Sequence, residues 1–187
     1  GVFKVGNISS KNKGKFTDSS DGFAFLFRQV EADKNFTLSV SGTVLECIAE
    51  KNQVGFGLML RDDVYINMTA ADASITSNSV TAGLLTGTTS SLNVNFLREN
   101  GAFNKGEQIA SHIHAAGDTF TASIERVGQT VTVTVVYGGQ TYTDTYYDFD
   151  FFAKDNGYMY VGMFANRGTV VEFTDVVFTV TGTSQGA

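Results

Sequence analysis

The sequence predicts an all-β fold in which two antiparallel sheets pack face to face as a jelly-roll sandwich. Apolar and polar residues alternate with a period of two along most of the chain, as they do in strands with one buried face. The composition favours strands and turns, with 16 Phe, 7 Tyr and 20 Gly but no Pro and no Trp. No long segment has helical periodicity, and about ten short strands in one chain of 187 residues are typical of a sandwich.

The chain is expected to form a single β-sandwich domain over residues 1–187. A chain of this length buries a sizeable core, and 42% of its residues are hydrophobic. Residues 1–19 are predicted to be an irregular N-terminal segment with an edge strand, and residues 183–187 to be a linker stub. Because the chain begins at Gly1 rather than at a methionine, we expect it to be one domain of a longer protein.

Four strands are predicted in the N-terminal half of the chain. In chain order, they lie at residues 22–30, 35–50, 54–62 and 91–99. In the first strand Phe alternates with other residues, and in the second large apolar residues alternate with Thr and Ser. Two glycines interrupt the third strand, and in the fourth Asn alternates with apolar residues. The segment AADAS at 70–74 is a candidate for a short helical turn.

The C-terminal half continues the alternation. Val131, Val133 and Val135 oppose threonines, and the Gly-Gly pair at 138–139 is typical of a hairpin turn. In chain order, strands are predicted at residues 119–127, 130–137, 140–149, 157–167 and 169–182. The segment FDFFAKD at 149–155 is a second candidate for a helical turn.

Two strands place glycine where a strand normally carries a side chain. In VGFGLMLRD, Gly55 and Gly57 share the face opposite Phe56, and in GYMYVGMFANR Gly162 shares a face with Tyr160. Glycines beside aromatic rings on an outer face are consistent with a shallow groove for a sugar ring, or with bulges that bend the sheet. The residues expected to bind a ligand there are Arg61, Tyr65, His112, His114, Tyr158, Tyr160, Asn166 and Arg167.

Charge and hydrophobicity exclude two classes of partner. The formal net charge is −6, whereas nucleic-acid-binding proteins present a basic surface, so no nucleic-acid partner is expected. No stretch approaches the ~18 consecutive apolar residues of a membrane-spanning helix, so no membrane span is expected. The single cysteine, Cys47, excludes an internal disulfide and is expected to be a buried structural thiol.

No set of residues has the spacing that catalysis requires, so no catalytic residue is predicted. Glycosidases need two carboxylates that flank the scissile bond, but Asp62 and Asp63 are adjacent and point to opposite faces of a strand. Asp144 and the carboxylates that follow it are expected at a solvated edge. His112 and His114 have a spacing that zinc sites use, but no third ligand lies nearby in the sequence.

Several segments resemble the concanavalin-like jelly-roll modules of bacterial extracellular polysaccharide-degrading enzymes, pectinases among them. These segments are DGFAFLFRQVEADKNFTLSVSGTV, QVGFGLMLRDD, DTFTASIERVGQTVTVTV and YVGMFANRGTVVEFTDVVFTVTG, and the resemblance spans residues 20–182. Its most specific parts are GLMLRDD and VGMFANR with VEFTDVVFT. The resemblance implies the sandwich fold. It implies function more loosely, because this fold carries lectins, glycosidases and lyases alike.

The function that the resemblance implies is a non-catalytic carbohydrate-binding module. Such a module would target a secreted bacterial enzyme to plant cell-wall polysaccharide, and Arg61 and Arg167 would suit the uronic acids of a pectin-like polymer. The resemblance also implies linked catalytic or anchoring domains, an extracellular or cell-surface location and a monomer. The alternatives are a catalytic jelly-roll lyase or glycoside hydrolase, and an adhesion or spacer module.

No cofactor is expected to be required, but a structural calcium ion is consistent with the resemblance. Jelly-roll modules often hold Ca²⁺ through carboxylates and backbone carbonyls. The candidate ligands are Asp18, Asp21 and Asp175, because the N- and C-terminal strands tend to lie side by side in such folds.

Overall fold

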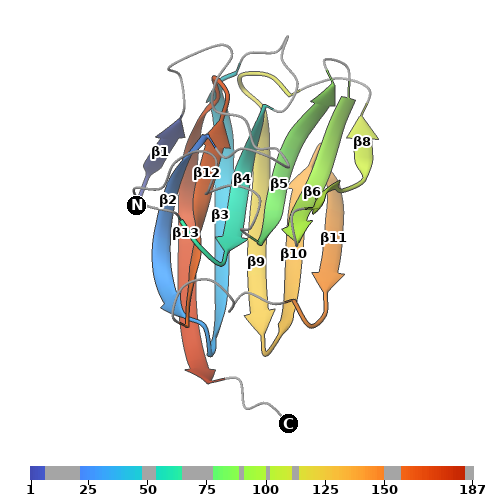
Figure 1. The fold of residues 1–187 in the computed structure, drawn as a ribbon. Helices are drawn as coiled ribbons and strands as arrows, with labels where there is room; N and C mark the ends of the chain where they lie inside the picture. The colour runs from blue at the N-terminus through green and yellow to red at the C-terminus, as the bar shows by residue number, and fades with distance from the viewer. Residues whose placement is uncertain are drawn as a thin grey trace.

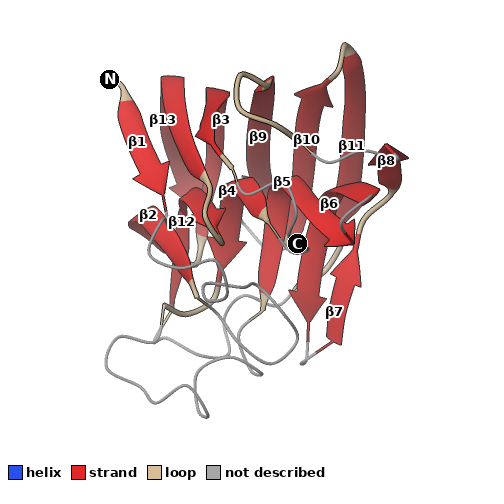
Figure 2. Cartoon of the chain, turned by 90° about the horizontal axis from the view of Figure 1, so that it is seen from above, coloured by secondary structure: helices blue, strands red, loops and turns tan. Residues whose placement is uncertain are grey.

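Two antiparallel β-sheets pack face to face in the computed structural model, which describes residues 1–6, 22–47, 54–64, 78–88, 91–99, 102–110, 114–149 and 157–183 (Figure 1). Strands make up 78% of the described residues, and helix makes up none of them. Seen from above, the sheets form two layers (Figure 2). The predicted all-β, two-sheet jelly-roll sandwich is therefore confirmed.

The six-stranded sheet has the strand order β1-β13-β3-β9-β10-β11. Its strands are β1 (Phe3–Gly6), β13 (Val170–Thr183), β3 (Lys34–Glu46), β9 (Thr119–Val127), β10 (Thr130–Tyr137) and β11 (Gln140–Tyr146). The predicted N-terminal edge strand is β1, which pairs with β13. Strands β9, β10 and β11 follow one another through turns at Gly128 and Gly138, whose positive φ angles of 62° and 59° favour glycine.

The seven-stranded sheet has the strand order β2-β12-β4-β5-β6-β7, and β8 also pairs with β6. Its strands are β2 (Phe23–Glu31), β12 (Tyr158–Asn166), β4 (Gly55–Arg61), β5 (Ser79–Thr88), β6 (Ser91–Glu99), β7 (Ala102–Lys105) and β8 (Gln108–Ala110). Strand β12 lies between β2 and β4, although it is distant from both in the sequence. Contacts across this sheet therefore join segments from the two ends of the chain.

The main core lies between the two sheets. It contains the apolar face predicted for β3, including Phe36 and Leu38, and the apolar faces of β4 and β10. Leu58 and Val133 are fully buried within it. The alternation of apolar and polar residues therefore identified the core-facing side of these strands correctly.

A second apolar cluster lies on the other face of the seven-stranded sheet. It consists of Met59, Leu85, Phe96 and Phe164, each no more than 1% exposed, with Phe23, Phe25 and Phe103 packed against it. All of β4 and every described side chain of β5 are consequently buried. Because a strand that is buried on both faces shows no alternation, the sequence pattern did not predict β5.

Some sequence-based expectations fall on residues that the structure does not describe. The helical turn at 70–74 lies outside the described residues, as does most of the one at 149–155, where only Phe149 is described. Thr183 is the last residue of β13, and 184–187 also lie outside the description. In the described part of the chain, no helix is long and apolar enough to cross a membrane.

Candidate functional site

The glycine-bearing face that was predicted to form a groove is the outer face of the seven-stranded sheet. Cross-strand pairing places Phe164 opposite Gly57 and Gly162 opposite Met59, so these residues share one face as predicted. This face carries the second apolar cluster. All four residues are buried, so no open groove floor is present at these glycines.

The glycines on this face are explained by the neighbouring strands rather than by a ligand. A Cβ atom at Gly162 would lie 2.6 Å from the Cα atom of Phe27, on β2, where a real Cβ is essentially never found. A Cβ at Gly57 would lie 2.5 Å from the Cα of Gly83, and Gly57 also has a φ of +142°, which L-residues rarely adopt. Close approach of neighbouring strands therefore accounts for both positions, whereas the alternative considered from the sequence was a bulge or a bend of the sheet.

Arg61 and Tyr160 lie opposite each other on β4 and β12, and both are buried. Arg61 is 3% exposed; its Nε donates to the carbonyl of Asp63 at 2.8 Å, and its guanidinium lies 5.0 Å from the ring centre of Phe23. Tyr160 is 6% exposed and packs edge-on against Phe27. These two side chains offer a ligand almost no surface in this structure, and their role as ligand contacts stays a prediction.

The other residues of the predicted site are dispersed. Asn166 is fully buried, and its Oδ1 accepts the backbone N–H of Gly55 at 2.5 Å. Arg167 is 5% exposed, and burial lowers the pKa of its guanidinium. Tyr158 is 37% exposed, and His114 is 1% exposed. Tyr65 and His112 lie outside the described residues.

The proposed calcium site is described only in part. Asp18 and Asp21 lie outside the described residues. Asp175 lies at a bulge in β13 between Thr174 and Val177 and has a φ of +51°, which Asp tolerates better than most residues. The expected proximity of the terminal strands is present, because β1 pairs with β13. Among the described residues no group of three or more potential metal ligands occurs, and the calcium ion stays a prediction.

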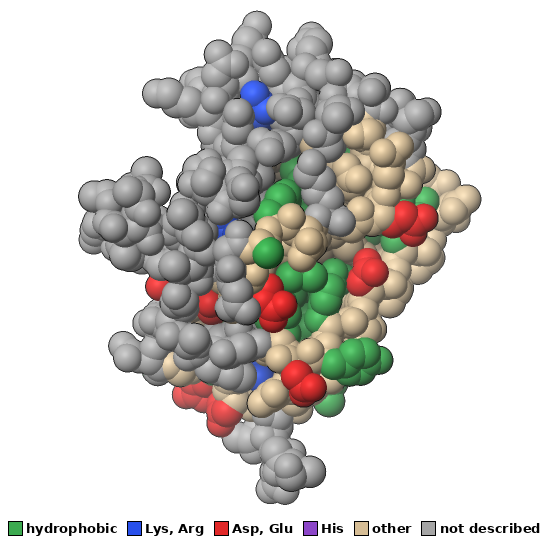
Figure 3. Space-filling model, turned by 45° about the vertical axis from the view of Figure 1, so that its right-hand side comes forward, with side chains coloured by type: hydrophobic (Ala, Val, Ile, Leu, Met, Phe, Trp, Pro, Cys, Tyr) green, Lys and Arg blue, Asp and Glu red, His purple; other side chains and the backbone are tan. Residues whose placement is uncertain are grey.

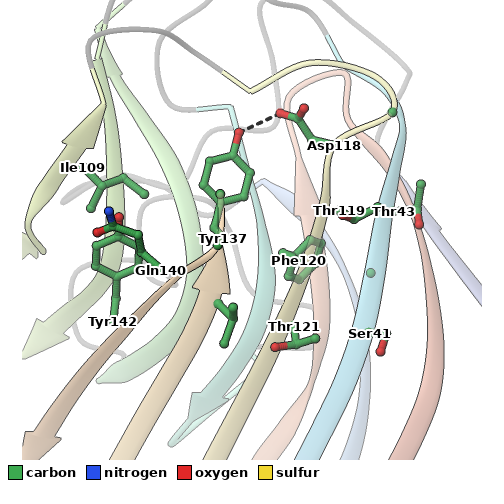
Figure 4. Close-up of a pocket in the computed structure, with 15 residues that line it drawn as sticks. Ser41, Thr43, Ile109, Asp118, Thr119, Phe120, Thr121, Tyr137, Gln140 and Tyr142 are labelled. Carbon is green, nitrogen blue, oxygen red and sulfur yellow. Dashed lines mark hydrogen bonds between the residues drawn. The ribbon is translucent and has the colours of Figure 1, made fainter.

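A different part of the molecule provides a solvent-accessible cavity. A hollow of about 770 Å³ lies at the end of the six-stranded sheet, where β9 begins and the β10–β11 hairpin turns. We call it the end hollow. The side chains of its lining that carry aromatic or polar groups include Asp118, Thr119, Thr121, Tyr137, Gln140 and Tyr142 (Figure 4). Its volume lies within the range of small-molecule sites.

Tyr137 and Asp118 are joined at the top of the end hollow (Figure 4). The Tyr137 hydroxyl donates to Oδ2 of Asp118 at 2.7 Å, and the same carboxylate oxygen accepts the backbone N–H of Ala115 at 2.9 Å. Burial, and then the contact with Asp118, raises the pKa of the Tyr137 phenol well above its ordinary value. Tyr137 therefore remains protonated at neutral pH and acts as a hydrogen-bond donor, not as a base.

Gln140 and Tyr142 form the opposite side of the end hollow and lie beside Ile109 of β8 (Figure 4). Gln140 is exposed, whereas Tyr142 is half-buried and packs against the main core. An amide can both donate and accept hydrogen bonds, and a tyrosine ring offers an apolar surface. The end hollow thus combines ring surface with neutral polar groups and one carboxylate.

His114 lies near this end of the sandwich but does not line the end hollow. Its ring packs edge-on against Phe56, with ring centres 4.7 Å apart, and neither ring nitrogen has a hydrogen-bond partner among the described residues. Burial lowers the pKa of His114 to about 4, although Asp118 opposes the change. Its carbonyl accepts the thiol of Cys47 at 3.2 Å; Cys47 is half-buried rather than fully buried as predicted.

The lining of the end hollow, among the described residues, holds few groups that could act as an acid or a base. Asp118 is the only carboxylate among the described residues that line it, whereas glycoside hydrolysis requires two. The buried His114 is neutral at pH 7 and does not reach the hollow. These described residues contain no paired acid and base, and the arrangement suits recognition of a hydroxyl-bearing ligand.

Residues 5–183 match the family described as the pectate disaccharide-lyase N-terminal domain. The chain belongs to this family. A curated relative, pectate lyase L of Thermoclostridium stercorarium, is 38% identical over 53 residues, which cover 28% of this chain and 4% of the relative. This pectate disaccharide-lyase N-terminal domain therefore matches only a small part of that protein. The predicted resemblance to accessory domains of polysaccharide-degrading enzymes is confirmed.

Solved structures with the same fold include proteins of several kinds. A functionally unknown protein from Saccharomyces cerevisiae aligns with a TM-score of 0.59 and 14% identity over 97% of both chains. Lectin UEA-II in complex with galactose aligns with a TM-score of 0.58 and 13% identity, over 97% of this chain and 93% of the lectin. The alginate lyase from Klebsiella pneumoniae aligns with a TM-score of 0.50 and 12% identity, over 97% of this chain and 81% of the lyase. At these identities the likeness shows the fold alone.

Sequence reasoning missed the residues of the end hollow in this pectate disaccharide-lyase N-terminal domain. Asp118, Tyr137 and Gln140 come from the ends of three strands, and each has an ordinary pattern in its own segment. The available signal was the Gly-Gly turn at 138–139 next to an aromatic residue, because hairpin ends are frequent positions for binding residues. That signal does not show which other segment lies beside the turn.

Proposed function

We propose that this domain is a non-catalytic carbohydrate-binding module that holds a linked pectate-lyase-type enzyme on plant cell-wall polysaccharide. The observation that carries the proposal is the end hollow, whose lining places Tyr142, Gln140 and Asp118 around a space of ligand size. Sugar sites typically combine an aromatic ring, which contacts the apolar face of the sugar, with polar groups that reach its hydroxyls.

The family provides the second support. Its description makes such domains the N-terminal part of a pectate disaccharide-lyase. A binding module on such an enzyme would raise the local concentration of substrate around the catalytic domain, as linked binding sites generally do. We therefore propose linked domains in the parent protein, secretion by a bacterium, an extracellular or cell-surface location and a monomeric module.

Catalysis by this domain itself is the second candidate function. A lyase needs a base that removes a proton, but the pKa of Tyr137 is raised rather than lowered, which makes it a poor base. The single carboxylate of the end hollow also leaves no partner for the acid–base pair of a hydrolase. These observations favour binding without turnover.

The proposal is tested by measuring binding and turnover with the same polysaccharides. Isothermal titration with soluble pectins, xylan and galactan is expected to show binding without new reducing ends or unsaturated products. Tyr142→Ala and Gln140→Ala should each weaken binding several-fold, because a ring or amide contact contributes about 1 kcal/mol. Tyr147→Ala is the matched control, since Tyr147 is 74% exposed and lies outside the end hollow.

Product formation that a substitution in this domain abolishes would show the domain to be an enzyme. Equal binding by the Tyr142, Gln140 and Tyr147 variants would move the site away from the end hollow. Because Tyr142 also packs on the core, a melting curve for each variant separates lost binding from lost folding. Gln140→Ala changes an exposed side chain and is therefore expected to leave the melting temperature unchanged.

A further inference from the structure

The outer face of the six-stranded sheet carries small hydroxyl-bearing side chains over four of its strands, β3, β9, β10 and β11. All outward residues of four strand segments are Ser or Thr, except Glu125 and Val136. The segments are Thr37–Thr43 of β3, Thr119–Glu125 of β9, Thr130–Val136 of β10 and Thr141–Thr145 of β11. Thr132 pairs with Thr145 and Thr134 with Thr143 through their hydroxyls, at 3.3 and 3.1 Å. Strand spacing of about 4.8 Å and a two-residue repeat of about 6.7 Å place these hydroxyls on a regular two-dimensional array.

This face is hollowed in its middle. A second hollow, of about 330 Å³, is lined by Ser39, Ser41, Thr121, Ser123, Thr134 and Asp175, together with the backbone between them. We call it the sheet hollow. Ser41 and Thr121 line both the sheet hollow and the end hollow, so the two hollows adjoin at these residues. We call the two hollows together the groove; its lining residues lie on the β10–β11 hairpin, on β9 and β3, and at the bulge at Asp175.

The groove carries negative charge and no positive charge in its described lining. Asp118 stands in the end hollow and Asp175 in the sheet hollow, and the lining of neither contains Lys, Arg or His. Glu125 is exposed on the same face. Lys4, at the edge of the sheet on β1, lies 3.7 Å from Glu172 and is already paired. The whole chain has a net charge of −6, and acidic side chains are spread over the side of the molecule drawn in Figure 3, which adds to the negative potential.

We propose that this groove binds an uncharged stretch of polysaccharide and excludes polygalacturonate, a deepening that rests on the proposed function. Ser and Thr hydroxyls both donate and accept, so they match the hydroxyls of a neutral sugar chain. Among the described lining residues a uronate carboxylate would find no cationic partner, and it would meet two carboxylates of its own sign. An array that repeats in two directions suits a polymer better than a single sugar, because successive residues of the chain meet equivalent groups.

Pectate, the polyanion in the family's description, is therefore not the polymer that this groove selects. The ligand class is a neutral cell-wall polysaccharide, or the methyl-esterified stretches of a pectin, in which the carboxylates carry no charge. The module would then hold the enzyme on a neutral polymer, or on a neutral region of a polymer. Neither is the charged polymer, pectate, that the family's description names.

The experiment uses two polymers that share one sugar backbone and differ in whether its carboxyl groups are methyl-esterified or ionised. A highly methyl-esterified homogalacturonan and the polygalacturonate made from it by de-esterification are titrated against the domain in EDTA at low ionic strength, with galactan, arabinan and xylan as further neutral probes. We expect at least one neutral polymer to bind, and polygalacturonate to bind at least about tenfold more weakly or not at all.

Polygalacturonate that binds in EDTA as tightly as the best neutral polymer would overturn the inference and leave the proposed function intact. Binding of polygalacturonate only after Ca²⁺ is added would overturn it too, because the cation would then supply the missing positive charge. If no polymer binds, the proposed function fails and the inference fails with it.

Two substitutions connect the selectivity to the groove. Asp175→Asn removes one carboxylate and should raise the affinity for polygalacturonate about threefold or more, while binding of the neutral polymer changes little. Asp148→Asn is the matched control, because Asp148 is also exposed, has a similar φ of +55° and lies outside both hollows. A similar gain in both variants would contradict the assignment to the groove.

Thr121→Val removes a hydroxyl that both hollows share and keeps the shape of the side chain. It should weaken binding of the neutral polymer several-fold, whereas Thr179→Val, an exposed threonine on β13 outside both hollows, should not. Equal binding by the two threonine variants would remove the sheet face from the site.

Discussion

The hydroxyl of Tyr137 and the carboxylate of Asp118 join the end of β10 to the turn that precedes β9, at a distance of 2.7 Å. Because Asp118 also accepts the backbone N–H of Ala115, one carboxylate holds both the turn and the tyrosine ring in place. This contact shapes the wall of the end hollow and, after burial, is the next cause that raises the pKa of Tyr137.

Tyr137→Phe is therefore expected to destabilise the domain by about 1.5–3 kcal/mol, the usual range for a hydrogen bond to a charged group. Urea unfolding at pH 7 measures the effect. Tyr147→Phe serves as the control, because Tyr147 is 74% exposed. Removal of its hydroxyl group should change the free energy of unfolding by less than about 0.5 kcal/mol. Equal small effects in the two variants would mean that the Tyr137–Asp118 bond contributes no net stability.

Gly162→Ala should destabilise the domain severely, by about 3 kcal/mol or more, because the new Cβ would overlap the backbone of β2 at Leu26 and Phe27. Gly182→Ala is the contrasting change, since a Cβ there meets nothing within 4 Å. Thermal unfolding should show a large decrease in melting temperature for Gly162→Ala and almost none for Gly182→Ala. A Gly162→Ala domain that melts like the wild type would show that the strands can separate at little cost.

His114 should make the domain acid-sensitive in a defined pH window. Its pKa is about 4 in the folded protein against an ordinary 6.5, so between these values the unfolded chain binds a proton that the folded chain does not. The stability from the neutral ring is complete above pH 6.5 and is lost as the pH falls towards 4, by up to about 3 kcal/mol. Unfolding free energies of the wild type and His114→Phe between pH 7 and 4 should diverge by this amount; parallel curves would refute the burial of an unprotonated ring.

Asn166→Ala separates a structural role from a ligand-binding role. Its Oδ1 accepts the buried N–H of Gly55, so we expect a loss of about 1–3 kcal/mol in stability. Asn104→Ala, at an exposed position of β7, is the control and should be neutral. If Asn166→Ala instead weakens polysaccharide binding and leaves stability unchanged, the ligand contact predicted from the sequence would hold.

The sequence alone determined which residues of most strands face the core. Alternation with a period of two follows directly from strand geometry, so the apolar faces of β3, β4 and β10 could be assigned without tertiary information. The same geometry placed Gly57 and Gly162 correctly on one shared face. The segments that resemble concanavalin-like modules also led to the right family.

Tertiary structure decided what each outer face meets. The face of Gly57 and Gly162 is buried beneath a second apolar cluster, and the glycines serve the close approach of neighbouring strands, which at Gly162 are distant in the sequence. Strand β5 was not predicted for a related reason: it is buried on both faces, so apolar and polar residues do not alternate along it. The groove at Asp118 and Ser41 depends on strand order and register, which bring β3, β9 and β10 together. A local pattern specifies the direction of a side chain, but only the packed chain determines whether that side chain meets solvent, a strand or a ligand.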